Sequence, residues 1–298
     1  MVAEDVDAAR LLKYTYTKSR IVDHNLDDAD LESRCPLDNG RHVTTRPRSF
    51  LGKLDLLPLE LITGVLLALD LPTLTAFRRV NQSAMNIVDI LRPYSMIVRH
   101  CPNVLRAVLS IEATSYDCQS LFETLSTSKC ITCGRFGGYL YLITCERVCY
   151  YCYTSHPAFL PIPVTRAAQA TGRTRKDLKR LPHIRSLPGK YTNWEKSSKV
   201  RGLLWDQRAI MGDSSGTSAQ KLAERSRKQD FTTRETVRFM SIISAPCFGP
   251  AGSTVDWGFW CVRCRDGPGT AGQFRVKFTK DAILDHIAGH ESQGTAKQ

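Results

Sequence analysis

The stretch KCITCGRFGGYLYLITCERVCYYC, residues 129–152, places a pair of cysteines on each side of an apolar, aromatic segment. Cys130 and Cys133 form the first Cys-x2-Cys pair, and Cys149 and Cys152 form the second. Two residues between thiolates allow a tight turn that directs both sulfur atoms at one ion, and tetrahedral zinc accepts two such pairs. The stretch therefore predicts a strand hairpin held by a structural zinc site. The alternative interpretation is four buried free cysteines.

A second group of candidate ligands lies further along the chain. Cys261 and Cys264 form another Cys-x2-Cys pair, and His286 and His290 follow within TKDAILDHIAGH. Histidines four residues apart on a helix present both rings on one side, so this group predicts a second zinc site. The 21 residues between the pair and the first histidine exceed the spacing of about 12 in DNA-reading fingers. The alternative is two exposed histidines beside an unrelated cysteine pair.

Neither group has the pattern of a catalytic site. Each supplies four protein ligands, which leaves no coordination position open for a reacting water. The histidine helix lacks the His-Glu-x-x-His pattern of metalloproteases, and no phosphate-binding loop of the Gly-x4-Gly-Lys-Ser/Thr type occurs in the chain. We therefore expect a non-catalytic protein. Cys145 and Cys247 remain additional candidate ligands.

Composition favours a soluble protein of the cytoplasm or nucleus. The chain has 11 cysteines, an odd number, and its first residues lack the apolar core of a secretory signal peptide. A disulfide framework is therefore not expected. Acidic residues interrupt the most apolar stretch, which falls short of the roughly 18 consecutive apolar residues that a membrane helix needs.

The excess positive charge is local. The net charge is +12, and 18 basic against 7 acidic residues lie between Arg166 and Met240, a net of +11. Such a segment attracts nucleic acid, anionic membrane or acidic proteins. Few aromatic residues interleave with the charges, so a solvated surface explains them equally well.

Apolar residues N-terminal to the cysteines recur at three- and four-residue steps, which indicates short amphipathic helices. They are Leu57, Leu61, Ile62, Val65, Leu66 and Leu69, then Leu74 and Phe77, then Val80, Ala84, Ile87, Val88 and Leu91. Pro58 fits the first turn of a helix, where its missing N–H costs nothing. A bundle this short has a marginal core, so we expect it to rest on a partner or on the next domain.

These observations predict an α+β protein: a three-helix bundle, a further helical segment and small zinc-stabilised modules. The expected division is a disordered tail over 1–50, the bundle over 51–94, a helical and four-cysteine region over 95–165, a basic linker or partly helical segment over 166–240, a Cys/His module over 241–290 and a tail over 291–298.

The bundle carries a family resemblance. LDLLPLELITGVLLALDLPTLTAFRRVNQSAMNIV, residues 54–88, resembles the F-box, with its Leu-Pro opening, apolar helix and break at Asp70. Asn81 departs from the cysteine that the family often has there. The downstream stretches VRHCPNVLRAVLS, HIRSLPGKY and WGFWCVRC, with the cysteine stretch and the final HIAGH, are similar to fungal F-box proteins. The resemblance covers Leu51 to His290 and is thin between Trp194 and Glu235.

The resemblance implies a function. F-box proteins dock on a Skp-type adaptor and so join a cullin-based ubiquitin ligase, while the rest of the chain binds a protein substrate and does no chemistry itself. The residues expected to contact the adaptor are Leu57, Pro58, Leu61, Ile62, Leu66, Leu74 and Val80. The alternative for these residues is that they form only the core of the bundle.

Two other functions remain open. The basic segment and the two metal sites also fit a zinc-containing regulator that binds nucleic acid. A structural zinc protein whose helical bundle binds no partner is the third interpretation.

Overall fold

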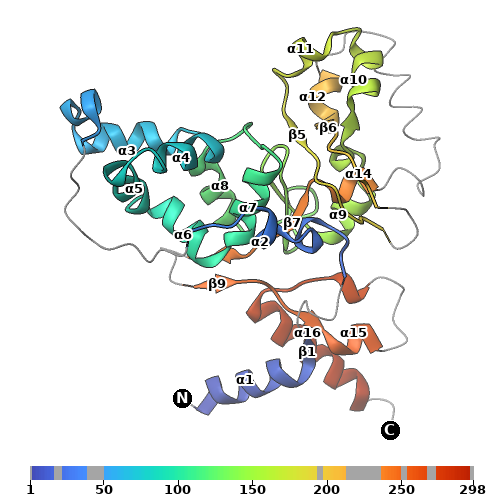
Figure 1. Ribbon diagram of the computed structural model, residues 1–298. Helices are drawn as coiled ribbons and strands as arrows, with labels where there is room; N and C mark the ends of the chain where they lie inside the picture. Colours follow the sequence, from blue (N-terminus) through green and yellow to red (C-terminus); the bar gives the residue numbers. More distant parts are fainter. Residues whose placement is uncertain are drawn as a thin grey trace.

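The computed structural model describes residues 2–16, 22–38, 50–192, 197–212, 236–249, 254–266 and 273–295. Short helices and short strands alternate along this part of the chain, so the fold is α+β, as the sequence predicted (Figure 1). None of the described helices is long and apolar enough to cross a membrane.

Three short helices occupy the stretch for which the apolar periodicity predicted them: α3 (Leu59–Leu67), α4 (Leu71–Arg78) and α5 (Gln82–Asp89). Side-chain caps set where two of them begin. Asp70 accepts a hydrogen bond from the Thr73 amide at 2.8 Å, at the start of α4. Asn81 accepts a hydrogen bond from the Ala84 amide at 2.8 Å, at the start of α5. Residues 52–56 before this bundle form the 3-10 helix η3 (Gly52–Leu56).

Three more helices follow and pack between the bundle and the rest of the protein: α6 (Arg92–His100), α7 (Pro102–Ser110) and α8 (Cys118–Leu125). Their apolar faces are fully buried at Ile97, Val104, Leu105, Val108 and Leu121. The helical segment predicted after the bundle is therefore present.

The central sheet has the strand order β3–β2–β7, all antiparallel: β2 (Tyr139–Tyr141), β3 (Glu146–Val148) and β7 (Ile242–Ser244). Tyr139 pairs with Val148 on one side and with Ser244 on the other. One hydrophobic core extends from this sheet to Leu66 of α3. The helices and the cysteine stretch therefore share a core, and β7 belongs to the central sheet rather than to the C-terminal module predicted over 241–290.

The predicted disorder over 1–50 is wrong for the described part of that segment. Leu26 and Leu31 are buried in the main core, on η2 (Leu26–Asp28) and α2 (Leu31–Arg34). Asp27 accepts a hydrogen bond from the Ser244 amide at 3.0 Å, and Asp23 accepts one from the Tyr139 hydroxyl at 3.0 Å. These side chains tie the segment to the sheet. Residues 39–49 lie outside the described part.

The segment 166–240, for which the sequence predicted a basic linker or a partly helical segment, forms a folded lobe with short helices over 166–192 and 197–212. Its sheet has the order β4–β6–β5, with the helices α10 to α12 against it: β4 (Ile162–Pro163), β5 (His183–Arg185), β6 (Leu203–Trp205), α10 (Val164–Thr171), α11 (Arg175–Leu178) and α12 (Gln207–Gly212). Trp205 is fully buried, and its indole donates to the Leu178 carbonyl at 2.8 Å. Residues 213–235 are not described.

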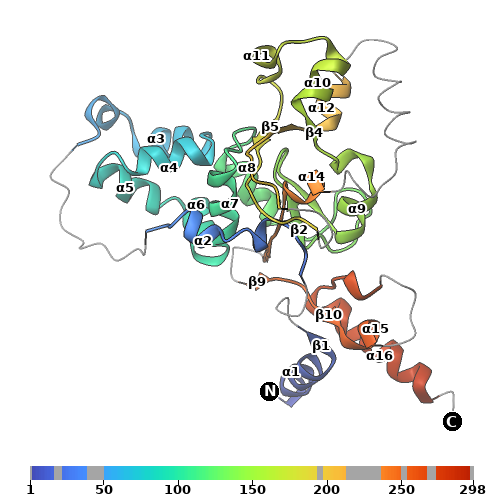
Figure 2. The ribbon, with the colours of Figure 1, turned by 45° about the vertical axis from the view of Figure 1, so that its right-hand side comes forward.

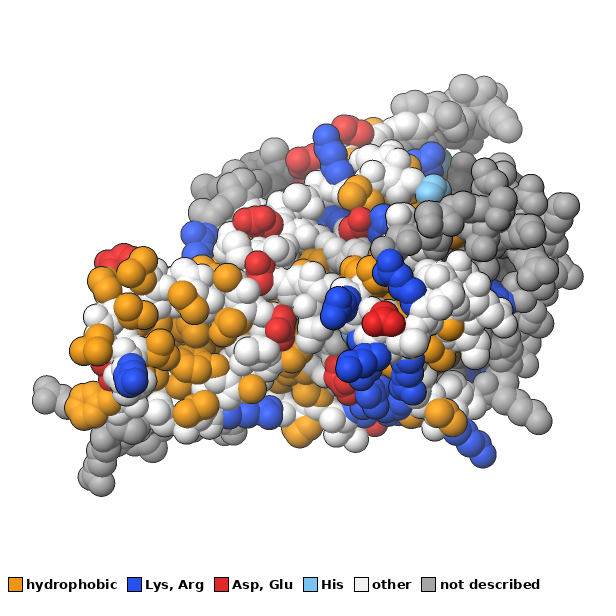
Figure 3. Space-filling model, turned by 90° about the horizontal axis from the view of Figure 1, so that it is seen from above, with side chains coloured by type: hydrophobic (Ala, Val, Ile, Leu, Met, Phe, Trp, Pro, Cys, Tyr) orange, Lys and Arg blue, Asp and Glu red, His pale blue; other side chains and the backbone are white. Residues whose placement is uncertain are grey.

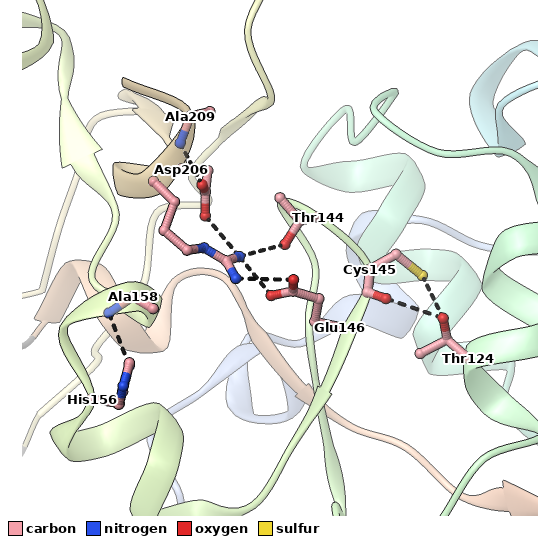
Figure 4. Close-up of polar contacts among 9 residues, drawn as sticks. Thr124, Thr144, Cys145, Glu146, His156, Ala158, Asp206 and Ala209 are labelled. Carbon is pink, nitrogen blue, oxygen red and sulfur yellow. Dashed lines mark hydrogen bonds and ion pairs between the residues drawn. The ribbon is translucent and has the colours of Figure 1, made fainter. Parts of the chain in front are cut away.

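One arginine joins this lobe to the central sheet. Arg208 of α12 donates to Glu146 of β3 at 3.0 Å and to the Thr144 hydroxyl at 3.1 Å. It also pairs with buried Asp206 at 3.2 Å (Figure 4). The lobe is therefore fixed to the sheet by a charge network as well as by apolar packing.

The C-terminal module includes the beginning of the chain. Strand β1 (Thr15–Tyr16), which follows α1 (Val2–Tyr14), pairs with β10 (Trp260–Cys261), so segments from near both ends of the chain form one module (Figures 1 and 2). Tyr16 stacks on Trp260, with ring centroids 5.7 Å apart. The final helix α16 (Lys280–Thr295) continues past residue 290, where the sequence predicted a tail.

A buried arginine fastens the central sheet to its surroundings. The Arg147 side chain is only 3% exposed, and its guanidinium donates to four backbone carbonyls, those of Thr124, Leu125, Gly137 and Pro246. Burial lowers the pKa of Arg147 to about 10. The guanidinium thus satisfies carbonyls of α8, of the turn before β2 and of the segment after β7, because one planar group offers five donors.

We expect the Arg147→Met variant to lose about 3 kcal/mol of unfolding free energy, because buried carbonyls would lose their donors. Chemical denaturation followed by circular dichroism measures this loss. Arg99→Met, at an exposed arginine of α6, is the matched control and should change stability little. Equal stability of the two variants would contradict this role for Arg147.

Candidate metal centres

The first candidate centre consists of the four cysteines that the sequence predicted. Cys130 and Cys133 lie in the turn before β2, and Cys149 and Cys152 lie at the start of α9 (Tyr150–Ser155). Their sulfur atoms all lie within 4.8 Å of one another, and those of Cys133 and Cys149 are 3.6 Å apart. Zinc–sulfur bonds of about 2.3 Å place two thiolates of one tetrahedron about 3.8 Å apart. The group, called centre 1 below, can therefore hold a metal ion.

The backbone around centre 1 is arranged by glycine and by close hydrogen bonds. The Gly134 amide donates to the Cys130 carbonyl at 2.9 Å, and Gly134 has a φ of +71° that favours glycine. At Gly137 a Cβ atom would lie 2.5 Å from Cγ of Arg147. Each glycine thus lets the chain bend or approach closely where the thiols converge.

The thiols of centre 1 change one another's acidity. Hydrogen bonding to Cys149 lowers the pKa of Cys130 to about 4, and the same contact raises the pKa of Cys149. The protons are therefore shared, because thiolates this close repel one another when no cation lies between them. A divalent ion would supply that positive charge, which fits the set of sulfur donors.

The two additional cysteines lie outside both groups of ligands. Cys145 is buried in the turn between β2 and β3, where its thiol faces the Thr124 hydroxyl at 3.6 Å (Figure 4). Burial raises the pKa of Cys145 to about 12, and the residue does not belong to either group of converging ligands. Cys247 is on β8 (Cys247–Phe248) and belongs to neither group of candidate ligands.

The second candidate centre, centre 2, joins Cys261 of β10 and Cys264 of α15 (Val262–Asp266) to His286 and His290 of α16. The Nε2 atoms of the two histidines lie 3.1 Å apart. The Cys264 sulfur lies 3.2 Å from Nε2 of His286 and 3.5 Å from Nε2 of His290. Three donors therefore face one point, and this group can also hold a metal ion.

The surroundings of centre 2 favour the forms that bind metal. Burial, then the neighbouring His290, lowers the pKa of His286, which keeps its ring neutral. The His286 ring stacks on Phe278 at 4.5 Å between centroids, which fixes its orientation. Among the described residues, the apolar cluster beside the centre is small, with Cys261, Ile283 and Ile287 as its buried members.

The residues predicted to contact an adaptor divide into two classes. Ile62, Leu66 and Leu74 are buried in the core, which fits the alternative that they form the core of the bundle. The others are exposed, namely Leu57, Pro58, Leu61 and Val80. The periodicity of a helix could not separate adjacent residues such as Leu61 and Ile62.

Further exposed apolar side chains accompany Leu61. Leu56 is 84% exposed, Leu59 51% and Val65 55%, and Leu61 itself is 57% exposed. We call Leu56, Leu57, Leu59, Leu61 and Val65 the apolar patch. Hydrophobic side chains gather at the end of the molecule that carries α3 (Figure 3, left). Exposed apolar groups in such numbers mark surfaces that contact other molecules.

Comparisons of the chain with protein-family models, with curated proteins and with solved structures found no match. The chemistry of the two centres and of the apolar patch therefore carries the functional argument.

We expect the purified protein to contain two zinc ions per chain by elemental analysis. Cys133→Ser and His286→Ala should each leave one, because each removes one of four ligands. Cys145→Ser is the matched control and should keep two. A loss of metal in that control would place Cys145 in centre 1 and contradict the geometry.

Loss of metal from centre 2 should release both ends of the chain, because so small a core cannot hold them alone. In the His286→Ala variant, backbone amides of 2–16 and 254–290 should exchange hydrogen faster by mass spectrometry, while α7 and β2 stay protected. Unchanged exchange at Thr15 and Tyr16 would show that β1 and β10 pair without the metal.

Proposed function

We propose that this chain is an F-box-type substrate receptor, which binds a Skp-type adaptor through the apolar patch and so joins a cullin-based ubiquitin ligase. The observation that carries the proposal is the division of α3 into two faces. Leu61 and Val65, one turn apart, face solvent, while Ile62 and Leu66, also one turn apart, are buried. The exposed pair offers an apolar stripe in the stretch that resembles the F-box.

The packing beneath the patch supports this assignment. Ile62 and Leu66 join the core that contains the central sheet, so the body of the protein holds α3 in place. A surface that is already ordered loses little conformational entropy on binding. Burial of apolar area contributes about 25 cal/mol per Å² before the costs of association. The patch is thus suited to helix-mediated docking.

Zinc is the ion proposed for both centres. Four thiolates, or two thiolates and two imidazoles, are the donor sets of structural zinc sites, and each set fills all four positions. The metals would hold the hairpin and the C-terminal module in shape. The chain would then do no chemistry itself and would promote ubiquitin transfer by holding a substrate close to the ligase.

The positions of the apolar patch and of the C-terminal module support a receptor function. The helices α3 and α5 lie at one end of the molecule, and the C-terminal module with α16 lies below the body, away from them (Figures 1 and 2). An adaptor on the patch would leave the C-terminal module and the basic lobe accessible to a protein substrate.

Binding of nucleic acid is the second candidate function, and one observation favours it. Arg173, Arg175, Lys176, Lys179 and Arg180 are all exposed on and beside α11, with Asp177 among them. Coulombic attraction to phosphates requires only such a concentration of charge.

We expect the double variant Leu61→Asp/Val65→Asp to bind a recombinant Skp-type adaptor at least about ten-fold more weakly than the unaltered chain, because two charges would face the apolar contact. Pull-down and calorimetry measure the affinity. Val200→Asp, at a residue that is 75% exposed, is the matched control and should bind normally. Circular dichroism should show equal folding of all three proteins.

An unaltered chain that forms no complex with the adaptor at micromolar concentration would contradict the receptor function. The salt dependence of the affinity distinguishes the two candidate functions. Binding to nucleic acid weakens steeply as the salt concentration rises, and apolar docking does not. Strong binding to nucleic acid with a steep salt dependence, and none to the adaptor, would favour that candidate.

A further inference from the structure

A cleft separates the hairpin of centre 1 from the C-terminal module. It has a volume of about 520 Å³, within the range of about 300–1,000 Å³ for ligand sites. Phe136 from the hairpin side and Phe278 from the module side contribute aromatic walls. Two separate parts of the chain thus form a concavity with apolar walls.

The charged residues of the cleft are all cationic. Lys129, Arg135 and Lys277 line it, and neither aspartate nor glutamate occurs among its described lining residues. Lys129 and Arg135 are exposed, so their charged ends are accessible to a ligand. An anionic group that enters the cleft would meet the charged ends of Lys129 and Arg135 on the hairpin side. The buried ammonium of Lys277 adds positive potential from the module side, where Cys264 and His286 of centre 2 also line the cleft.

Lys277 fixes the two sides of the cleft together. Its side chain is 6% exposed, and its ammonium donates to the Trp257 carbonyl at 2.9 Å and lies 4.2 Å from the Trp260 ring centroid. At Gly138 a Cβ atom would lie 2.5 Å from Cδ of Lys277, so the lysine stem passes directly over the hairpin. The positive charge at the base of the cleft is therefore held in place.

We propose that this cleft binds an anionic side chain of a protein segment, either a phosphorylated residue or a carboxylate. The inference rests on the proposed receptor function, because that function requires a protein ligand. Arg135 and Lys129 would pair with the anionic group, and the aromatic walls would contact the apolar residues beside it. Arginine suits this role, since its guanidinium forms paired hydrogen bonds with phosphate and carboxylate.

A competing role for the cations is to neutralise centre 1. Four thiolates around a divalent ion leave a net charge of −2, which nearby lysine and arginine would stabilise. The two roles differ in what a substitution changes. Loss of the cations would release the metal in one case and a bound peptide in the other.

The experiment uses the immobilised full chain and three libraries of ten-residue peptides, with phosphoserine, glutamate or serine fixed at the centre. We expect at least one of the two anionic libraries to be retained at least about ten-fold more than the serine library. Retention of phosphoserine alone would identify a phosphorylated ligand, and retention of both would identify a general acidic one. Equal retention of all three libraries would overturn the proposal.

Two double variants test the cleft itself. Lys129→Glu/Arg135→Glu should lose the preference for anionic peptides. Lys176→Glu/Arg180→Glu, which makes the same change of charge on and beside α11, should keep it. Loss in both variants would indicate a bulk charge effect, and a preference kept in the cleft variant would place binding elsewhere. Both results would overturn the proposal.

Metal content and adaptor binding complete the test. Both variants should keep two zinc ions, and loss of one from the cleft variant would assign its cations to a metal centre instead. Both should also bind the adaptor normally. Peptide selectivity without adaptor binding would remove the receptor function and leave the anion site. Adaptor binding without peptide selectivity would remove the anion site and leave the receptor function.

Discussion

Four thiol groups within 4.8 Å of one another set the condition on which the rest of this structure depends. As thiolates they would repel one another, so a cation bound between them would stabilise the approach of the turn before β2 to the start of α9. Strand β2 follows that turn and is the middle strand of the central sheet. Its residues share one core with the helices, so a metal bound at this point would also brace that core.

The same convergence separates the surfaces of the molecule. The core of the central sheet extends to α3, whose outward residues form the apolar patch, while the hairpin of centre 1 forms one side of the cationic cleft. One surface is apolar and the other is charged, so they suit partners of different chemistry. A receptor needs such a division, because it must hold a constant partner and a variable one at once.

Local chemistry could be predicted from the sequence. One turn of chain sets the spacing within Cys-x2-Cys and His-x3-His, so the sequence predicted both groups of four candidate ligands. Capping by Asp70 and Asn81 is local in the same sense, because each side chain accepts from an amide three residues further on. Contacts between residues that are distant in the sequence could not be predicted in this way. Leu61 and Ile62 fit one apolar pattern, and only packing decides which is buried. Polar Asp23 and Asp27 gave no signal of the sheet contacts that order the N-terminal segment.

The pairing of β1 with β10 has a consequence for the order of events during synthesis. Tyr16 leaves the ribosome well before Trp260, on which it stacks, because 243 residues separate the two. Contacts between such distant residues form late and slowly. Helix α1 must therefore wait without these neighbours until that length of chain has been made, and during that interval it is open to chaperones and proteases.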